Sequence, residues 1–272
     1  MMIASIVNSQ TIQVYDLQQF DIYAILHSGQ IFRYWQTEAG WLVMSREHWA
    51  EIKQQSNQII ITCDDARYFY NFFDLDTDYE KIKKNLCAPK LRNAIEYGAG
   101  IRILNADFVE IVLSFIISAN NNIKRFTKTI NSLCEAYGTM TFCGHNSFPS
   151  LSQFAKIRLE DYQRFGCGYR SEYLVTAVQQ LTDLDFNELQ KLSNENLKRE
   201  LVKIKGVGPK VAACIMLFAF HRLDVAPVDT WIKKAIAQLS FDEQKEILAG
   251  EYAGIAQQYI FYFLQHLQRE VL

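Results

Sequence analysis

A lysine and an aspartate in the second half of the chain have the types and spacing for nucleophilic chemistry at a bound anion. Lys210 directly follows the turn 206–209, Gly-Val-Gly-Pro, and Asp229 comes nineteen residues later. A helix over 210–221 would rise about 17 Å, and the loop 222–228 can extend about 23 Å at most. The loop is long enough to bring Asp229 back beside Lys210, where an amine and a carboxylate suit Schiff-base formation.

The turn that precedes the lysine is suited to binding a phosphate. We expect Gly206 and Gly208 to adopt backbone conformations that a side chain forbids, and Pro209 favours the first position of a helix. The amides around Val207 then lie at the positive end of that helix, where anions bind. The turn alone equally allows a hairpin, over about 194–221, that grips duplex backbone and catalyses nothing.

The segment from Lys198 to Trp231 resembles the hairpin and active site of the helix-hairpin-helix DNA glycosylases, and most closely those that act on 8-oxoguanine. Further blocks resemble the family in the same order: SGQIFR at 28–33, SFIISANNNIKR at 114–125 and GCGYRSEY at 166–173. The resemblance implies that Lys210 attacks the sugar of 8-oxoguanine in duplex DNA, opposite cytosine, and that Asp229 assists it. A Schiff base and strand cleavage by β-elimination would follow, without a cofactor or catalytic metal.

Four residues match the positions that fill the gap in the duplex and read the base opposite the lesion. A glycosylase must flip its target out of the duplex and fill the gap. By resemblance, Tyr169 fills the gap, while Asn120, Arg125 and Arg170 contact the orphaned cytosine. The residues alone also allow bland roles: Asn120 as a helix cap and Tyr169 as a turn aromatic that covers the core.

Four other residues match the positions that hold the flipped base. 8-Oxoguanine carries a donor N–H at N7 where guanine has an acceptor, and the resemblance assigns its recognition to the Gly29 carbonyl. Cys214 and Phe261 match the two sides of a sandwich around the base, and Gln257 matches the residue that reads its pairing edge. The residues alone would make Gly29 a helix C-cap and Phe261 a core residue.

The chain departs from the family pattern at two places. Trp231 stands where the family has a phosphate-contacting histidine, so a phosphate there must go unbound or be held differently. Gln258 and Tyr259 stand where smaller apolar residues are usual, which alters the expected pocket shape. The resemblance also allows a cation on the hairpin carbonyls, which are those of Val202, Ile204 and Val207.

Mechanistically, a protonated lysine cannot attack, so we expect the helix terminus and the closed pocket to favour the neutral amine of Lys210. We expect Asp229 to stabilise the positive charge that develops at C1′. A glycosylase for another damaged purine and a non-enzymatic duplex-binding protein are the alternatives. The Lys210–Asp229 pair argues against the binding protein, and the NNN and GYR blocks argue against another base specificity.

Composition and charge are those of an ordinary globular protein of 272 residues with net charge −2. Basic residues gather at 191–210 and 124–128, which favours a local DNA-binding face. The six cysteines lack C-x-x-C spacing, which argues against a zinc or iron–sulfur site. No apolar run approaches the roughly 20 residues of a membrane span, and the N-terminus lacks a secretory signal. We expect an intracellular monomer in the cytoplasm or nucleoid.

The apolar periodicity predicts an α+β protein. An antiparallel sheet is expected up to about residue 65, in the segments 11–17, 31–37, 40–46 and 57–63. Helices are expected afterwards, with the longest at 107–119, 122–137, 171–183, 209–221 and 254–268. We place the domain junction near residue 98, which gives a sheet domain over 1–98 and a helical domain over 99–272.

Overall fold

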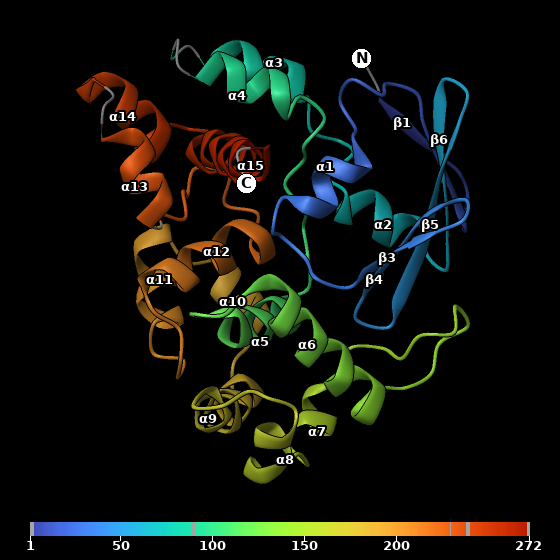
Figure 1. Ribbon diagram of the computed structural model, residues 1–272, viewed down its shortest axis with the longest axis vertical. Coiled ribbons are helices and arrows are strands. Elements are labelled where there is room, and N and C mark those ends of the chain that lie inside the picture. Colours follow the sequence, from blue (N-terminus) through green and yellow to red (C-terminus); the bar gives the residue numbers. More distant parts are fainter. Residues whose placement is uncertain (1–2, 87, 89–90, 229, 238–239, 271–272) are drawn as a thin grey trace.

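The computed structural model describes residues 3–86, 88, 91–228, 230–237 and 240–270 (Figure 1). Within these ranges, the N-terminal part forms a six-stranded antiparallel sheet of order β1-β2-β6-β5-β4-β3. The strands are β1 (Ala4–Asn8), β2 (Thr11–Val14), β3 (Tyr34–Thr37), β4 (Gly40–Ser45), β5 (His48–Gln55) and β6 (Gln58–Cys63). The predicted antiparallel sheet is confirmed.

Strands β1 and β5 were not among the predicted strands, and β5 lies inside the sheet between β4 and β6. Its core-facing residues are Ala50 and Ile52, which are fully buried, and Ile52 pairs with Ile61 of β6. Glu51 and Lys53 alternate with them and form a salt bridge at the surface. An apolar residue at every second position is the sequence signal of a half-buried strand. In β5 only Ala50 and Ile52 follow this pattern, which is too short to be recognised among the charged residues.

Helices make up the rest of the described chain. One short helix, α1 (Ile22–His27), interrupts the sheet, and the others follow it. These are α2 (Ala66–Phe72), α3 (Tyr79–Asn85), α4 (Arg92–Tyr97), α5 (Phe108–Ser118), α6 (Ile123–Tyr137), α7 (Leu151–Phe154), α8 (Leu159–Arg164), α9 (Arg170–Thr182), α10 (Phe186–Gln190), α11 (Asn194–Leu201), α12 (Pro209–Ala219), α13 (Thr230–Ile236), α14 (Phe241–Ala249) and α15 (Ala253–Glu270). The α+β class is confirmed, whereas α10 and α14 were not predicted.

Two apolar helices, α5 and α12, form the centre of the helical part, because nearly every residue of each is buried. They pack against each other, and α5 also packs against α6 and α9. Figure 1 shows the sheet on one side of this centre and α15 above it. Helix α4, which precedes the predicted junction at residue 98, packs on the C-terminal helix α15. The junction itself stays a prediction.

A buried arginine ties the start of the helical part to the sheet domain. Arg102 is inaccessible to solvent and donates hydrogen bonds to the carbonyls of Gln19 and Phe73, each at 3.1 Å. Its guanidinium lies 4.2 Å from the ring centroid of Tyr79, a favourable cation–π distance. Among the described residues, no helix has the length and apolar character needed to cross a bilayer.

Candidate active site

The hairpin between α11 and α12 presents backbone amides around Lys210. Gly206 has φ +89°, and a Cβ there would lie 3.1–3.2 Å from Tyr173 and Ile116, so only glycine fits. The expectation that Gly208 also needs such a conformation is wrong, because its φ is −86° and its ψ is 177°. A Cβ at Gly208 would meet nothing within 4 Å. The missing side chain at this position leaves the helix terminus open instead.

Lys210 is the second residue of α12, directly after Pro209 at the first helical position, as predicted. Its side chain is exposed, and Nζ lies 5.7 Å from the ring centroid of Phe115 on α5. The lysine lines two adjacent cavities, one toward α15 and one toward the end of α5. Lys210 therefore reaches both the interior and the open face of the molecule.

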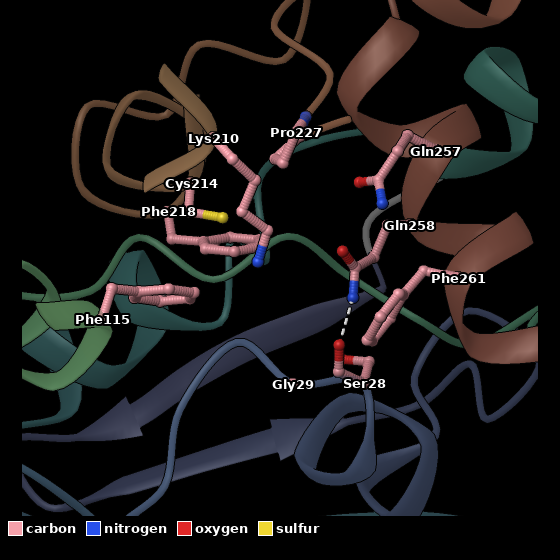
Figure 2. Close-up of a pocket in the computed structure, with 10 residues that line it drawn as sticks. All are labelled: Ser28, Gly29, Phe115, Lys210, Cys214, Phe218, Pro227, Gln257, Gln258 and Phe261. Carbon is pink, nitrogen blue, oxygen red and sulfur yellow. Dashed lines mark hydrogen bonds between the residues drawn. The ribbon is translucent and has the colours of Figure 1, made fainter. Parts of the chain in front are cut away.

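The inner cavity brings together four of the residues predicted to hold the lesion. Figure 2 shows α12 on one side and α15 opposite, with the loop after α1 below. The cavity is lined by Ser28, Gly29, Phe115, Lys210, Cys214, Phe218, Pro227, Gln257, Gln258 and Phe261. Its volume is ≈ 30 Å³, about that of one water molecule. A purine can enter only if the side chains around this space move apart.

Gly29 is held in the cavity wall by its sequence neighbours. Asp21 caps the N-terminus of α1, and Gly29 follows the C-cap residue Ser28 with φ +77°, so the C-capping interpretation is confirmed. A Cβ at Gly29 would lie 3.2 Å from the Phe261 ring. Gln30 is fully buried and bonds to the Arg102 carbonyl and the Leu104 amide, each at 2.8 Å. These bonds anchor the loop to the helical part.

Two neighbouring glutamines of α15 face the same space from above. Gln257 is 4% exposed, and within the described chain its Oε1 has no hydrogen-bond partner. A buried polar atom without a partner is costly, so its position in a cavity wall points to a ligand. Gln258 is 2% exposed and donates from Nε2 to the Ser28 carbonyl (Figure 2). The sequence marked Gln258 only as a departure and did not assign it to the site.

The loop after α5 is held by a buried arginine. Asn120 has φ +49°, a left-handed conformation at the end of α5, whereas Asn122 caps α6. Arg170 is 6% exposed and donates to the carbonyls of Ala119 (2.7 Å from Nε) and Asn120 (2.9 Å from Nη2). These bonds occupy Nε and Nη2 of the guanidinium, and no contact with a base is present to compare with them. That predicted contact of Arg170 therefore stays a prediction.

Tyr169 and Arg125 are exposed on the face where Asn120 lies. The Tyr169 side chain is 54% exposed, so the interpretation as a core-covering aromatic is wrong. Its ring lies beneath the Arg170 guanidinium at 4.5 Å and packs edge-on against Tyr173. Arg125 is exposed near the N-terminus of α6. Both side chains are accessible to a macromolecule that covers this face.

Asp229 lies outside the described residues, and so does the side chain of Trp231. The residue before Asp229, Val228, lines a cleft of ≈ 430 Å³ together with Lys210 and Asn120. Lys233 of α13 lines the same cleft, although the sequence did not single it out. The proximity of Asp229 and Lys210 is supported by Val228 but stays a prediction.

Half of the basic residues in the cluster at 191–210 are paired with nearby glutamates. Salt bridges join Lys191 to Glu188 (2.6 Å), Lys203 to Glu200 (2.7 Å) and Arg199 to Glu195. Lys205 instead lies 5.3 Å from the ring centroid of Tyr173. This run of charge therefore contributes less to an anion-binding face than its sequence indicates.

Comparison with known proteins identifies the class of molecule that carries this site. Residues 12–112 match the family model of the N-terminal domain of 8-oxoguanine DNA glycosylase. Residues 113–251 match that of the HhH-GPD superfamily base excision DNA repair proteins. The chain belongs to the HhH-GPD superfamily of base excision DNA repair proteins and, within it, to the 8-oxoguanine DNA glycosylases.

Individual relatives agree with this membership. A probable N-glycosylase/DNA lyase of Methanothermobacter thermautotrophicus is 30% identical over 230 residues, which cover 74% of each chain. The Clostridium acetobutylicum 8-oxoguanine glycosylase/lyase, solved with DNA containing cytosine opposite 8-oxoguanine, is 32% identical with a TM-score of 0.88. That match covers 98% of this chain and all of the other. A 3-methyladenine DNA glycosylase of Archaeoglobus fulgidus, 15% identical with a TM-score of 0.66 over 93% and 96% of the two chains, shares the fold alone.

Proposed function

We propose that this chain is a bifunctional DNA glycosylase and lyase that removes 8-oxoguanine from duplex DNA opposite cytosine. One observation carries the proposal: Lys210, Gly29, Cys214, Gln257 and Phe261 line a single cavity although they come from three distant parts of the chain. A protein that only binds duplex DNA has no use for a lysine amine that lines one cavity with the buried, unpartnered Oε1 of Gln257. The relatives named as N-glycosylase/DNA lyase support both activities.

The reaction follows from the position of Lys210 at the cavity mouth. The neutral amine attacks C1′, the glycosidic bond breaks, and 8-oxoguanine leaves with the bonding electron pair. Asp229 stabilises the positive charge that develops at C1′ and assists proton transfer to and from the reacting groups. The sugar ring then opens to a Schiff base on Lys210. β-Elimination breaks the bond to the 3′ phosphate and cuts the strand.

Lesion recognition rests on the wall opposite Lys210. The Gly29 carbonyl would accept the N7 hydrogen of 8-oxoguanine and repel the N7 lone pair of guanine. The unpartnered Oε1 of Gln257 is suited to accept a donor from the base's pairing edge. Because the Phe261 ring lies against Gly29, that ring must swing away to stack on the base. Stacking of this kind contributes about 1–3 kcal/mol.

The remaining residues of the site contact the duplex. The hairpin amides and Lys233 would bind lesion-strand phosphates, and so replace the phosphate contact of the family histidine at whose position this chain has Trp231. Tyr169 fills the gap left by the flipped base, and Asn120 and Arg125 read the orphaned cytosine. We further propose that the protein acts as a monomer in the cytoplasm, on nucleoid DNA.

Arg125→Ala should weaken the preference for cytosine opposite the lesion. The fork of an arginine suits the acceptors at N3 and O2 of cytosine, and each such contact contributes about 1–3 kcal/mol to base discrimination. Discrimination against undamaged guanine should persist, because it depends on Gly29. The measurement is the excision rate with cytosine, thymine or adenine opposite 8-oxoguanine. Arg164→Ala on α8 is the control, and an unchanged partner ratio in Arg125→Ala would make Arg125 a phosphate contact.

Gln258→Leu should raise the KM for lesion DNA with a smaller change in kcat. The substitution removes the hydrogen bond to the Ser28 carbonyl and leaves a buried acceptor without its donor, which costs about 1–3 kcal/mol. The Gly29 loop would then be less well positioned to receive the base. Gln265→Leu, two turns further along α15, is the matched control. Equal KM values in the two variants would show that Gln258 serves packing alone.

The activity itself is tested with three matched duplexes. The protein should release 8-oxoguanine opposite cytosine, leave a guanine–cytosine duplex intact and act more slowly with adenine opposite the lesion. Strand nicking without added alkali reports the lyase step. No release of 8-oxoguanine from the duplex with cytosine opposite the lesion would overturn the proposal.

A further inference from the structure

A further concave surface lies along α6, apart from the two cavities that Lys210 lines. We call it the α6 groove, and its volume is ≈ 580 Å³. It is lined by Phe32, Tyr34, Ile123, Lys124, Thr127, Lys128, Asn131, Ser132 and Glu135. Its lining comes from α6 and, in the N-terminal part of the chain, from Tyr34 of β3 and Phe32 just before that strand (Figure 1).

The groove carries two lysines, and neither forms a salt bridge with a carboxylate in the described part of the chain. Lys124 and Lys128 are exposed and stand one helical turn apart on the same face. Like charges at this spacing destabilise a helix, and no described acidic residue forms a salt bridge with either lysine. By contrast, Arg199 of α11 is paired with Glu195, and Lys203, just after α11, is paired with Glu200. The unpaired lysines on α6 therefore favour an external anion.

The floor of the groove continues into the wall of the lesion cavity. Phe32 packs edge-on against Phe126, with ring centroids 4.6 Å apart, and against Phe115 at 5.7 Å. Phe115 lines both cavities that contain Lys210. Asn120 lies in the short loop between α5 and α6, two residues before Asn122, which caps α6. An anion in the groove would thus be continuous with DNA bound over the active site.

We propose that the α6 groove binds the phosphodiester backbone of the strand opposite the lesion, next to the orphaned base. The proposal rests on the proposed function, because it uses the duplex that the active site binds. From Lys124 to Asn131 the helix rises about 11 Å, which matches about three nucleotides of one strand. Glu135 limits the groove at its far end, because a carboxylate repels phosphate. The contact is therefore short and confined to one arm of the duplex.

The test is the salt dependence of binding to a duplex that contains a stable abasic analogue opposite cytosine, which the enzyme cannot process. Each neutralised phosphate contributes about 0.9 to the slope of log K against log salt concentration. The double variant Lys124→Gln/Lys128→Gln should reduce the magnitude of this slope by about 1.8, so its binding should depend less steeply on salt. The control Lys81→Gln/Lys245→Gln removes the same charge from α3 and α14 and should keep the wild-type slope.

Shortening the duplex locates the contact. With one arm cut to a single base pair beyond the lesion, the double variant and wild type should give equal slopes. With the other arm cut, the difference should remain. Equal slopes on the full duplex, or a difference that survives both truncations, would overturn the groove assignment. A wild-type protein that forms no borohydride adduct with lesion DNA would instead contradict the proposed function.

Discussion

Replacing Asp229 with asparagine should lower the rate of 8-oxoguanine excision by roughly 100- to 10,000-fold. The substitution removes the charge that stabilises the developing cation at C1′. Asparagine caps a helix about as well as aspartate, and α13 begins at Thr230, so the free energy of unfolding should change little. Single-turnover excision on an 8-oxoguanine–cytosine duplex and chemical denaturation give the two quantities.

Asp224→Asn is the matched control for this variant. Asp224 lies in the same loop, exposed, and accepts a hydrogen bond from Asn194 at 2.7 Å. The Asp224→Asn variant should excise 8-oxoguanine at the wild-type rate. Normal excision by Asp229→Asn would reduce Asp229 to a helix cap.

Lys210→Gln should abolish both strand cleavage and covalent trapping by borohydride, while lesion duplex binding survives. Glutamine keeps the polarity and most of the length of the side chain but has no amine to attack C1′, so no Schiff base can form. Because Lys210 is exposed on α12, the substitution should not unfold the protein, and unfolding would not explain the loss of activity. Binding is measured on the abasic-analogue duplex, and trapping by gel shift under denaturing conditions.

The Lys233→Gln variant shows whether the loss of trapping comes from the loss of the nucleophile or only from the loss of a positive charge in the cleft. Lys233 lines the same cleft as Lys210, and the variant should still be trapped at saturating protein concentration. If borohydride trapped the Lys210→Gln variant but not the Lys233→Gln variant, the nucleophile would be Lys233 of α13.

Much of the site was predictable because its signals are local. The glycine turn, the proline at the first helical position and Lys210 lie within five consecutive residues, and the structure has them at the start of α12. Gly29 likewise ends α1 as expected. The local rule failed at Gly208, however, because its backbone conformation is one that any residue can adopt. The absence of a side chain there leaves the N-terminus of α12 accessible instead.

Some long-range contacts that hold the site had no signal in the sequence. Gln258 bonds to Ser28 from 230 residues away, and Arg170 bonds to Ala119 from 51 residues away. Nothing in either residue's neighbours encodes such a partner, because the fold alone brings them together. The strand β5 was missed for a different reason, since charged residues alternate with its two core residues.

Reduction of the covalent intermediate tests the central claim most directly. The wild-type protein is incubated with an 8-oxoguanine–cytosine duplex in the presence of borohydride, digested, and mapped by mass spectrometry. We predict a single sugar adduct, on Nζ of Lys210, and none with a guanine–cytosine duplex. An adduct on any other residue, or no adduct at all with the lesion duplex, would contradict the assignment of Lys210 as the nucleophile.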